Sequence, residues 1–157
     1  LKTAEKDEIK QEIAYYKEHR FLFQYGIFDR TDLSSDREQF TVRNEEEAVS
    51  TKYRRLVHAA PKQETLKVAH LEDDAFYSVE SRSHLLFMHQ RTAPMKQGRL
   101  TADGEGVHAP EEHYQASGNA LAQGIRLSYL FNGYFSKEVR IPADFGSEMY
   151  DIHKECK

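Results

Sequence analysis

A change of pattern at Gly26 constrains the fold of this chain more than any other feature. Before it, apolar residues recur at helical spacing on one face, namely Ile9, Ile13, Tyr16 and Phe23. Glycine is a natural helix end, because it tolerates the left-handed conformation that follows a last turn. We therefore expect a single helix over residues 4 to 24.

The end of this predicted helix is unusually aromatic. Its last turn, RFLFQY at 20–25, is apolar nearly all round. The aromatic residues between 15 and 28 are Tyr15, Tyr16, Phe21, Phe23, Tyr25 and Phe28. A helix that is apolar on every side is buried from several sides. We therefore expect the end of the helix to need a second neighbour besides the strands that follow it.

After Gly26 the chain reads as short apolar runs separated by turn signals. The predicted strands are 37–43, 48–57, 65–71, 75–80, 83–90, 125–131, 136–142 and 148–154. In 37–43, Phe40 and Val42 share one face. The stretch 92–120 is rich in Gly and Pro and predicts loops, with one short helical turn at Pro110, and 132–134 (NGY) predicts a hairpin turn. This spacing predicts a mainly β fold, an antiparallel β-sandwich preceded by one long N-terminal helix.

Composition excludes several classes of function. The 157 residues suffice for one domain, and the net charge of -4 argues against a nucleic-acid partner. No run approaches the roughly 18 apolar residues of a membrane span. The single cysteine, Cys156, cannot form an internal disulfide, which fits a reducing compartment, so we expect a cytoplasmic protein. Because the chain begins at Leu1, directly at the predicted helix, we expect it to be a piece of a longer protein.

Adjacent carboxylates occur at 45–47, 73–74 and 111–112. Neighbours in a strand point to opposite faces, and neighbours in a turn point to water. We interpret all three groups as solvated turns and predict no catalytic and no substrate-binding residue. Asp144 opens the letters of a kinase metal motif, but no glycine-rich loop accompanies it, so we set that interpretation aside.

The histidines do not predict a metal site. His84 and His89 are five residues apart, and so are His108 and His113. An odd spacing on a strand sends two side chains to opposite faces, whereas zinc needs three or four convergent ligands. We predict no metal and no cofactor, and we interpret these histidines as exposed or hydrogen-bonded. Cys156 has no basic partner in the pattern that would activate it as a nucleophile.

A sugar-stacking surface is a further option to weigh. Its best candidates are the aromatic residues around the predicted hairpin, Tyr129, Phe131, Tyr134 and Phe135. Most aromatic residues of a sandwich are core. The chain also has no tryptophan, which offers the largest stacking surface.

Residues 13–31 resemble a signature of glycoside hydrolase family 36, the melibiase-type α-galactosidases. The family pattern is close to I-x-x-Y-K-x-x-R-x-L-x-Q-x-G-x-F-x-R-L. It is filled in register by Ile13, Tyr16, Lys17, Arg20, Leu22, Gln24, Gly26, Phe28 and Arg30. Thr31 stands where leucine is usual.

Three further segments resemble the same family in the same order. They are 45–56 (EEEAVSTKYRRL), 66–79 (LKVAHLEDDAFYSV) and 144–150 (DFGSEMY). Asp73 replaces a proline, and Met149 replaces a leucine. The middle departs most, because 110–118 (PEEHYQASG) has His113 and Tyr114 where the family has two apolar residues.

The resemblance implies a parent enzyme and a place within it. Residues 1–26 would be the last helix of a catalytic (β/α)₈ barrel, and 27–157 would be the C-terminal antiparallel β-sandwich domain. The parent would be a retaining glycosidase with two aspartates about 5–5.5 Å apart. Both aspartates would lie on barrel strands upstream, so no catalytic residue carries over. The chain itself would be a non-catalytic domain that caps the barrel and can help to assemble subunits.

Two rival hypotheses stay open, a free-standing carbohydrate-binding module and a β-sandwich interaction domain with no sugar role. The helix discriminates between them and the barrel-capping hypothesis. A helix buried fully against its own sandwich favours the rivals. A helix that is displaced from the sandwich, or that packs on a neighbouring molecule through its apolar end, favours the domain of a larger enzyme.

Overall fold

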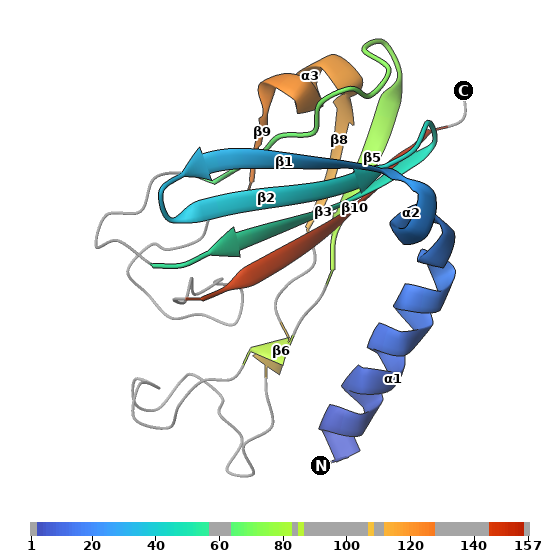
Figure 1. Cartoon of the computed structure of the whole chain (residues 1–157), viewed down its shortest axis with the longest axis vertical. Helices are drawn as coiled ribbons and strands as arrows, with labels where there is room; N and C mark the ends of the chain where they lie inside the picture. Colours follow the sequence, from blue (N-terminus) through green and yellow to red (C-terminus); the bar gives the residue numbers. More distant parts are fainter. Residues whose placement is uncertain are drawn as a thin grey trace.

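The computed structural model describes residues 3–56, 64–82, 85–86, 107–108, 112–127 and 145–155. A helix leaves one end of a twisted antiparallel sheet and extends away from it (Figure 1). The helix predicted over 4–24 is present in two parts, α1 (Thr3–Glu18) and α2 (Arg20–Tyr25). His19 separates them, with φ -90° and ψ 10°. Backbone hydrogen bonds from His19 N to Tyr15 O and from Phe23 N to His19 O, both 3.0 Å, continue across the break.

Gly26 ends the helix for a different reason from the one predicted. Its φ is -69° and its ψ is 162°, which is extended backbone rather than the left-handed conformation. A Cβ at this position would lie 2.5 Å from the carbonyl oxygen of Leu22 and 2.7 Å from Cγ1 of Val42. Glycine is therefore needed because the helix end and the neighbouring strand approach each other closely.

Six strands form the main sheet, and every neighbouring pair is antiparallel. Their spatial order is β1 (Ile27–Ser34), β2 (Arg37–Arg43), β3 (Glu47–Arg54), β10 (Ser147–Lys154), β5 (Phe76–Ser81) and β8 (His113–Ser117). The C-terminal strand β10 thus lies in the middle of the sheet, between β3 and β5. Pairing between segments so far apart in sequence ties the end of the chain to its beginning.

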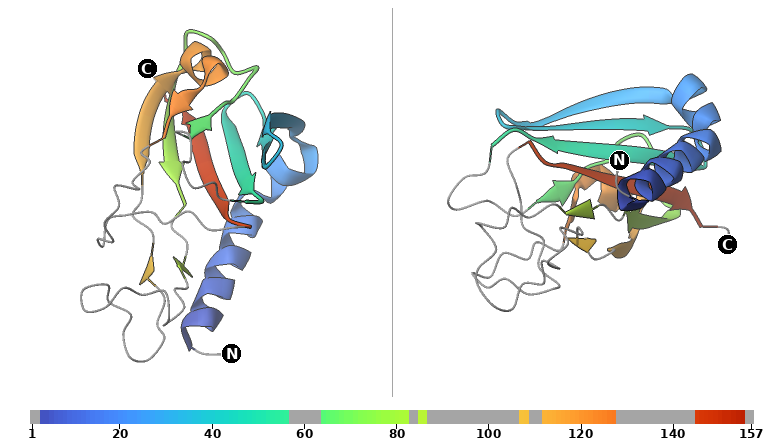
Figure 2. Two further views of the ribbon diagram at one scale, coloured as in Figure 1. Left: turned by 90° about the vertical axis from the view of Figure 1, so that its left-hand side faces the viewer. Right: turned by 90° about the horizontal axis from the view of Figure 1, so that it is seen from below.

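A smaller second layer covers one face of this sheet. It contains β4 (Thr65–Leu66), which pairs with β9 (Ile125–Arg126), and helix α3 (Gly118–Gln123). The Ser117 hydroxyl caps α3 by accepting from the Ala120 N–H at 3.2 Å. Figure 2 shows this layer on the side of the sheet away from α1. A separate pair of short strands comprises β6 (Leu85–Leu86) and β7 (Val107–His108).

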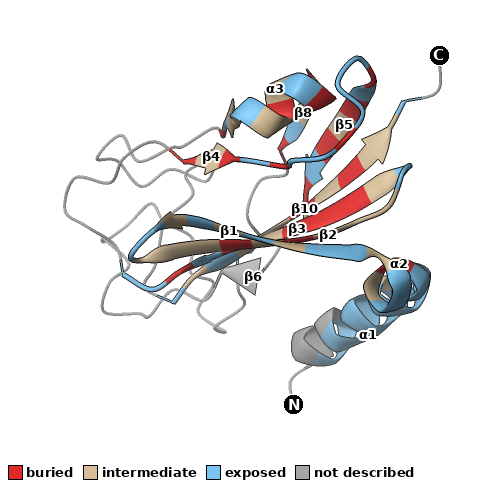
Figure 3. Ribbon diagram, turned by 45° about the horizontal axis from the view of Figure 1, so that its top comes forward, coloured by how far each residue is buried: buried red, intermediate tan, exposed pale blue. Residues whose placement is uncertain are grey.

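The hydrophobic core lies between the two layers. Its most deeply buried large members are Tyr77, Val79, Tyr150 and Ile152 from the sheet, and Leu66, Val68, Leu121 and Leu127 from the second layer. Each is at most 2% exposed. Full burial of such a side chain stabilises the fold by about 1.5–3 kcal/mol. Figure 3 shows buried residues along β3, β10 and β5, whereas α1 is exposed.

The apolar side of β2 faces away from this core. The alternation predicted for 37–43 is confirmed, but Gln39 and Thr41 are buried on the core side. The Thr41 hydroxyl bonds to that of Ser50 at 3.0 Å, which satisfies both polar groups inside. Phe40 and Val42 therefore belong to the outer face of the sheet, the face on which the helix lies.

Several predicted strands are confirmed and others are shorter. The predictions at 37–43, 48–57, 75–80 and 148–154 correspond to β2, β3, β5 and β10. Of 65–71 and 125–131, only the first two residues are strand among those described. Strand β8 and helix α3 occupy a stretch that was predicted as loop. The predicted strand at 136–142 and the turn at 132–134 lie outside the described residues, as does Pro110.

The predicted fold class is confirmed. The described chain is mainly β, with a large antiparallel sheet and an N-terminal helix. Within the described part, the second layer of the sandwich is much smaller than the first.

Candidate functional site

One side of α1 is attached to the outer face of the sheet. Tyr15 donates its hydroxyl to a carboxylate oxygen of Asp151 in β10. The guanidinium of Arg82 lies 3.8 Å above the centre of the Tyr15 ring. Burial, together with the bond to the Asp151 carboxylate, raises the pKa of Tyr15 far above its usual value, so the hydroxyl stays a donor.

His19 lies on the same side of the helix. Its side chain is 8% exposed, and its Nδ1 is 3.6 Å from Oε2 of Glu47 at the start of β3. The Nδ1 of His153 is 3.9 Å from the same Glu47 oxygen. Leu22, one turn further on, is 1% exposed. Tyr15, His19 and Leu22, at spacings of four and three, therefore form the face that the helix turns toward its own sheet.

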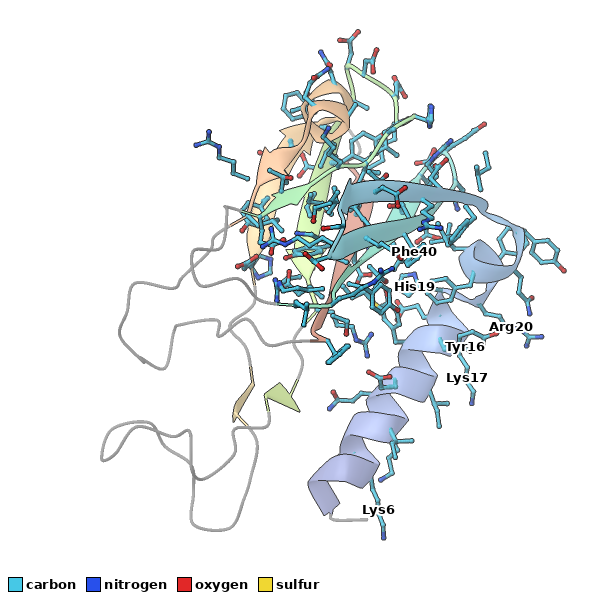
Figure 4. All side chains as sticks on the ribbon, turned by 60° about the vertical axis from the view of Figure 1, so that its left-hand side comes forward. Lys6, Tyr16, Lys17, His19, Arg20 and Phe40 are labelled. Carbon is cyan, nitrogen blue, oxygen red and sulfur yellow. The ribbon has the colours of Figure 1, made fainter. Side chains whose placement is uncertain are left out.

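The apolar stripe that predicted the helix lies elsewhere on it. Ile9 is 45% exposed, Ile13 is 50% exposed and Tyr16 is 50% exposed. Tyr16 stacks on Phe23 at 5.9 Å between ring centroids, which extends the stripe to α2. Figure 4 shows Tyr16 pointing away from the sheet, whereas His19 points toward it. We call Ile9, Ile13, Tyr16 and Phe23 the outward stripe.

Further apolar side chains are exposed on α2 and on the outer face of the sheet. Phe21 and Tyr25 in α2 are each 72% exposed, and their rings contact each other at 5.0 Å. On the outer face of the sheet, the rings of Phe28, Phe40 and Tyr53 follow one another at 5.8 and 5.6 Å. This aromatic row crosses β1, β2 and β3 on the face that carries α1. Large exposed apolar patches are rare on monomeric soluble proteins and are typical of an interface.

A cluster of charges lies on the opposite, inner face, beneath the second layer. The carboxylate of Glu64 is 2.5 Å from Lys52 Nζ, 2.9 Å from an Arg54 nitrogen and 3.3 Å from an Arg37 nitrogen. Arg54 also contacts Glu148 at 3.4 Å. Lys52, Arg54 and Glu64 are all buried. Buried charges are tolerated only when they are paired in this way.

The pairing sets the protonation of this buried cluster. Burial alone would raise the pKa of Glu64, but the charges and hydrogen bonds of Lys52 and Arg54 outweigh it and hold the pKa below its usual value. Burial lowers the pKa of Lys52, against the opposing effect of Glu64. The cluster joins strand β3 to the chain just before β4, so its role is to hold the two layers together.

The carboxylates singled out in the sequence do not converge on one site. Glu45, Glu46, Asp73 and Asp74 are exposed, as the solvated-turn interpretation expects. Two residues differ. Glu47 is half-buried and faces His19, and Glu112 is buried, accepts from the Tyr114 hydroxyl at 3.0 Å and has its N–H bonded to Ser81. Glu111 and Asp144 lie outside the described residues.

The other candidate residues are likewise dispersed or not described. His113 is exposed, with Nδ1 3.6 Å from Glu80. In the described part of the chain, no group of three or more His, Cys, Asp or Glu is arranged to hold a metal ion.

No helix among the described residues is long and apolar enough to cross a membrane. The remaining candidates cannot be placed in the site, because they lie outside the described residues or have no described side chain. They are His84, His89, His108, Cys156, Tyr129, Phe131, Tyr134 and Phe135.

Sequence reasoning missed the buried cluster around Glu64 and the pair of histidines around Glu47. One signal for the cluster was available. Lys52 and Arg54 stand two apart in a strand, so both must lie on the same face. Nothing in the sequence marks Glu64 as their partner, because that contact depends on how the second layer folds back.

Comparison with known proteins points to one group of enzymes. No protein-family model matches the sequence, and no curated protein sequence matches it significantly. The fold, in contrast, matches the GH36 α-galactosidase AgaA of Geobacillus stearothermophilus in complex with raffinose, with a TM-score of 0.65 and 22% identity. It also matches an α-galactosidase of Lactobacillus brevis, with a TM-score of 0.64 and 19% identity. A third match is the galactosidase domain of the α-galactosidase–sucrose kinase AgaSK, with a TM-score of 0.64 and 16% identity.

The match covers this chain almost completely but only a small part of the matched structures. These structures cover 99–100% of this chain, whereas the chain spans 16–17% of their length. The family resemblance expected from residues 13–31 is thus confirmed at the level of the fold. The chain has the fold of a segment that makes up about a sixth of these GH36 α-galactosidases.

Proposed function

We propose that this chain is a non-catalytic, C-terminal domain of an α-galactosidase, whose role is to cap the catalytic barrel of the same polypeptide. The whole enzyme would hydrolyse terminal α-D-galactosyl residues of oligosaccharides such as melibiose or raffinose, with retention of configuration. Residues 1–26 would belong to the barrel as its last helix, and 27–157 would form the capping domain. The enzyme would act in the cytoplasm and could associate into oligomers through this domain.

The orientation of the outward stripe carries this proposal. Every described side chain of α1 before Tyr15 is exposed. A lone helix of about 12–15 residues is only marginally stable in water, so this helix needs packing on its apolar side. Its own sheet contacts only the side of Tyr15 and His19. The outward stripe therefore requires a neighbour that the described residues do not supply.

The aromatic row supports the same neighbour. Asp151, which binds Tyr15, is two residues from Met149, and Met149 pairs with Thr51, the partner of Phe40. Phe40 and Asp151 consequently share one face of the sheet. The helix and the aromatic row thus both expose apolar side chains on the same side of the domain. This arrangement is expected of a domain that packs on a larger one. The solved α-galactosidases that contain this fold are about six times longer than this chain, which supports such a body.

The chemistry of the described residues supports a non-catalytic role. A retaining glycosidase needs two carboxyl groups about 5–5.5 Å apart in an open site. The described carboxylates that are buried, Glu64 and Glu112, are engaged in structural contacts. The exposed ones are spread over α1, over strands β1 and β5, and over the turns at 45–46 and 72–74. We infer that the reacting carboxylates belong to the barrel.

The experiment that tests this function is an activity assay on two proteins. Hydrolysis of p-nitrophenyl α-galactoside is measured for the 157-residue chain and for the polypeptide encoded by the longer reading frame that contains it. We expect activity only in the longer polypeptide. Activity in the 157 residues alone, or a reading frame that encodes no barrel, would overturn the proposal.

A further inference from the structure

We propose that the surface covering α1 is an apolar groove with carboxylates along the border that meets Lys6, Lys17 and Arg20, and that the remainder of the same polypeptide supplies it. This inference rests on the proposed function, and adds the chemistry of the partner surface. It comes from three cations, Lys6, Lys17 and Arg20, which flank the outward stripe.

The positions of these cations follow from helical spacing. Lys6 precedes Ile9 by three residues, Lys17 follows Ile13 by four, and Arg20 follows Tyr16 by four. Residues three or four apart lie on the same helix face. Figure 4 shows Lys17 and Arg20 projecting from the side of the helix that carries Tyr16. Positive charge therefore lines one border of the outward stripe, whereas the exposed acid Glu12, three residues after Ile9 and four before Tyr16, lies at the border nearer the sheet.

These cations differ from most others of the domain in having no acidic partner. Lys10 pairs with Asp7 at 3.2 Å, and Arg43 pairs with Asp29 at 2.7 Å. Among the side chains that the structure describes, no carboxylate forms an ion pair with Lys6, Lys17 or Arg20. A surface that covers the stripe would also desolvate these three charges, which is costly unless it brings carboxylates to meet them.

Two other occupants fit the described charges less well. An anionic bilayer attracts helices with a cationic polar face, but α1 also carries exposed acids at Asp7, Glu12 and Glu18 that the bilayer would repel. A second copy of the chain is acidic overall, with a net charge of -4, but it would leave the barrel without its last helix. The remainder of the polypeptide could both bury the outward stripe and place carboxylates beside its cations.

The test uses the longer polypeptide in three forms. One is unchanged, one carries Lys17→Glu with Arg20→Glu, and one carries Lys67→Glu with Arg126→Glu. Lys67 and Arg126 are exposed in the second layer and make no described ion pair, so the control changes net charge equally. Hydrogen exchange of the α1 amides is followed at low and high salt. Sedimentation with phosphatidylserine vesicles is measured for the same three proteins.

We expect the α1 amides of the unchanged polypeptide to be protected, independently of protein concentration. Lys17→Glu with Arg20→Glu should speed their exchange about tenfold or more, while the control leaves it unchanged. High salt screens these charges, so it should reduce the difference in α1 exchange rate between the two variants. None of the proteins should sediment with vesicles.

Other outcomes separate the two proposals. If α1 is protected but the reversal acts no more strongly than the control, the proposed function stands and the carboxylate border is wrong. If α1 is unprotected, the docking itself is wrong. Vesicle binding that is lost only in Lys17→Glu with Arg20→Glu would assign this face of α1 to a bilayer. Protection of the α1 amides that rises with protein concentration would assign it to a second copy of the chain. Either result would overturn this inference.

Discussion

Tyr15 and Tyr16 are neighbours in the sequence, yet Tyr15 faces the sheet, whereas Tyr16 projects from α1 in a direction roughly 100° away. The hydroxyl of Tyr15 is bonded to Asp151 of the sheet, with Arg82 above its ring. Tyr16 is 50% exposed and stacks only on Phe23 among the rings described. The first tyrosine attaches the helix to its own domain. The second belongs to the surface that we assign to the docking of the barrel.

Removal of the two hydroxyl groups should therefore have unequal effects. Tyr15→Phe leaves the half-buried Asp151 carboxylate without its donor, so we expect the free energy of unfolding to fall by about 1–3 kcal/mol. Tyr16→Phe should change it by less than about 0.5 kcal/mol. Urea unfolding of the 157-residue chain measures both. Equal losses for the two variants would contradict the different surroundings of the two hydroxyl groups.

Glu64 should be among the most sensitive polar residues of the domain. Glu64→Gln removes the carboxylate that neutralises Lys52 and Arg54 and leaves their charges buried. We expect a loss of about 3–5 kcal/mol in the free energy of unfolding. Glu45→Gln, in the exposed turn between β2 and β3, is the matched control and should change stability by less than about 0.5 kcal/mol. A Glu64 variant as stable as the control would show that the cluster does not hold the layers together.

The same residue predicts a dependence of stability on pH. The pKa of Glu64 is lower in the folded chain than its ordinary value of about 4.3. Between these two pKa values the unfolded chain binds more protons, so stability rises with pH there. The contribution of Glu64 is complete above about pH 5 and is lost as the pH falls through the folded pKa. Urea midpoints from pH 3 to 7 should show a smaller acid loss in Glu64→Gln than in the unchanged chain, and identical slopes would refute this.

Gly26 should resist substitution because of space rather than backbone conformation. Gly26→Ala would place a methyl group 2.5 Å from the Leu22 carbonyl oxygen and 2.7 Å from Val42. We expect a loss of about 1–3 kcal/mol, typical of overpacking. In a Val42→Ala background the loss should be smaller, since one of the two close contacts is gone. A loss that is the same in both backgrounds would remove Val42 from the explanation.

The sequence predicts the elements of this domain better than their faces. The alternation of Phe40 and Val42 identifies β2, and the spacing of Ile9, Ile13 and Tyr16 identifies the helix. Neither pattern says which side meets the core. In both elements the apolar side faces outward, and polar residues such as Gln39 and Thr41 are buried. Periodicity alone cannot separate a face that packs on its own domain from one that packs on another body.

The stretch 113–123 escaped prediction for a local reason. The strand HYQAS of β8 contains few β-branched or large apolar residues, and its pairing with β5 supplies the stability. Glu64 was unpredictable for a non-local reason, because it meets Lys52 and Arg54 only when β4 folds over the sheet. The solvated carboxylates at 45, 46, 73 and 74 were predictable, since turns of this composition face water.

Burial of Ile13 in the longer polypeptide tests the central claim most directly. Ile13→Cys and, as an exposed control, Gln123→Cys are each made with Cys156→Ser to remove the native thiol. The rate of reaction with a maleimide is then measured under native conditions. We predict that the cysteine at position 13 reacts about 100-fold more slowly than the one at 123, because the barrel covers the outward stripe. Equal rates at the two positions would contradict the docking of α1 on the rest of the polypeptide.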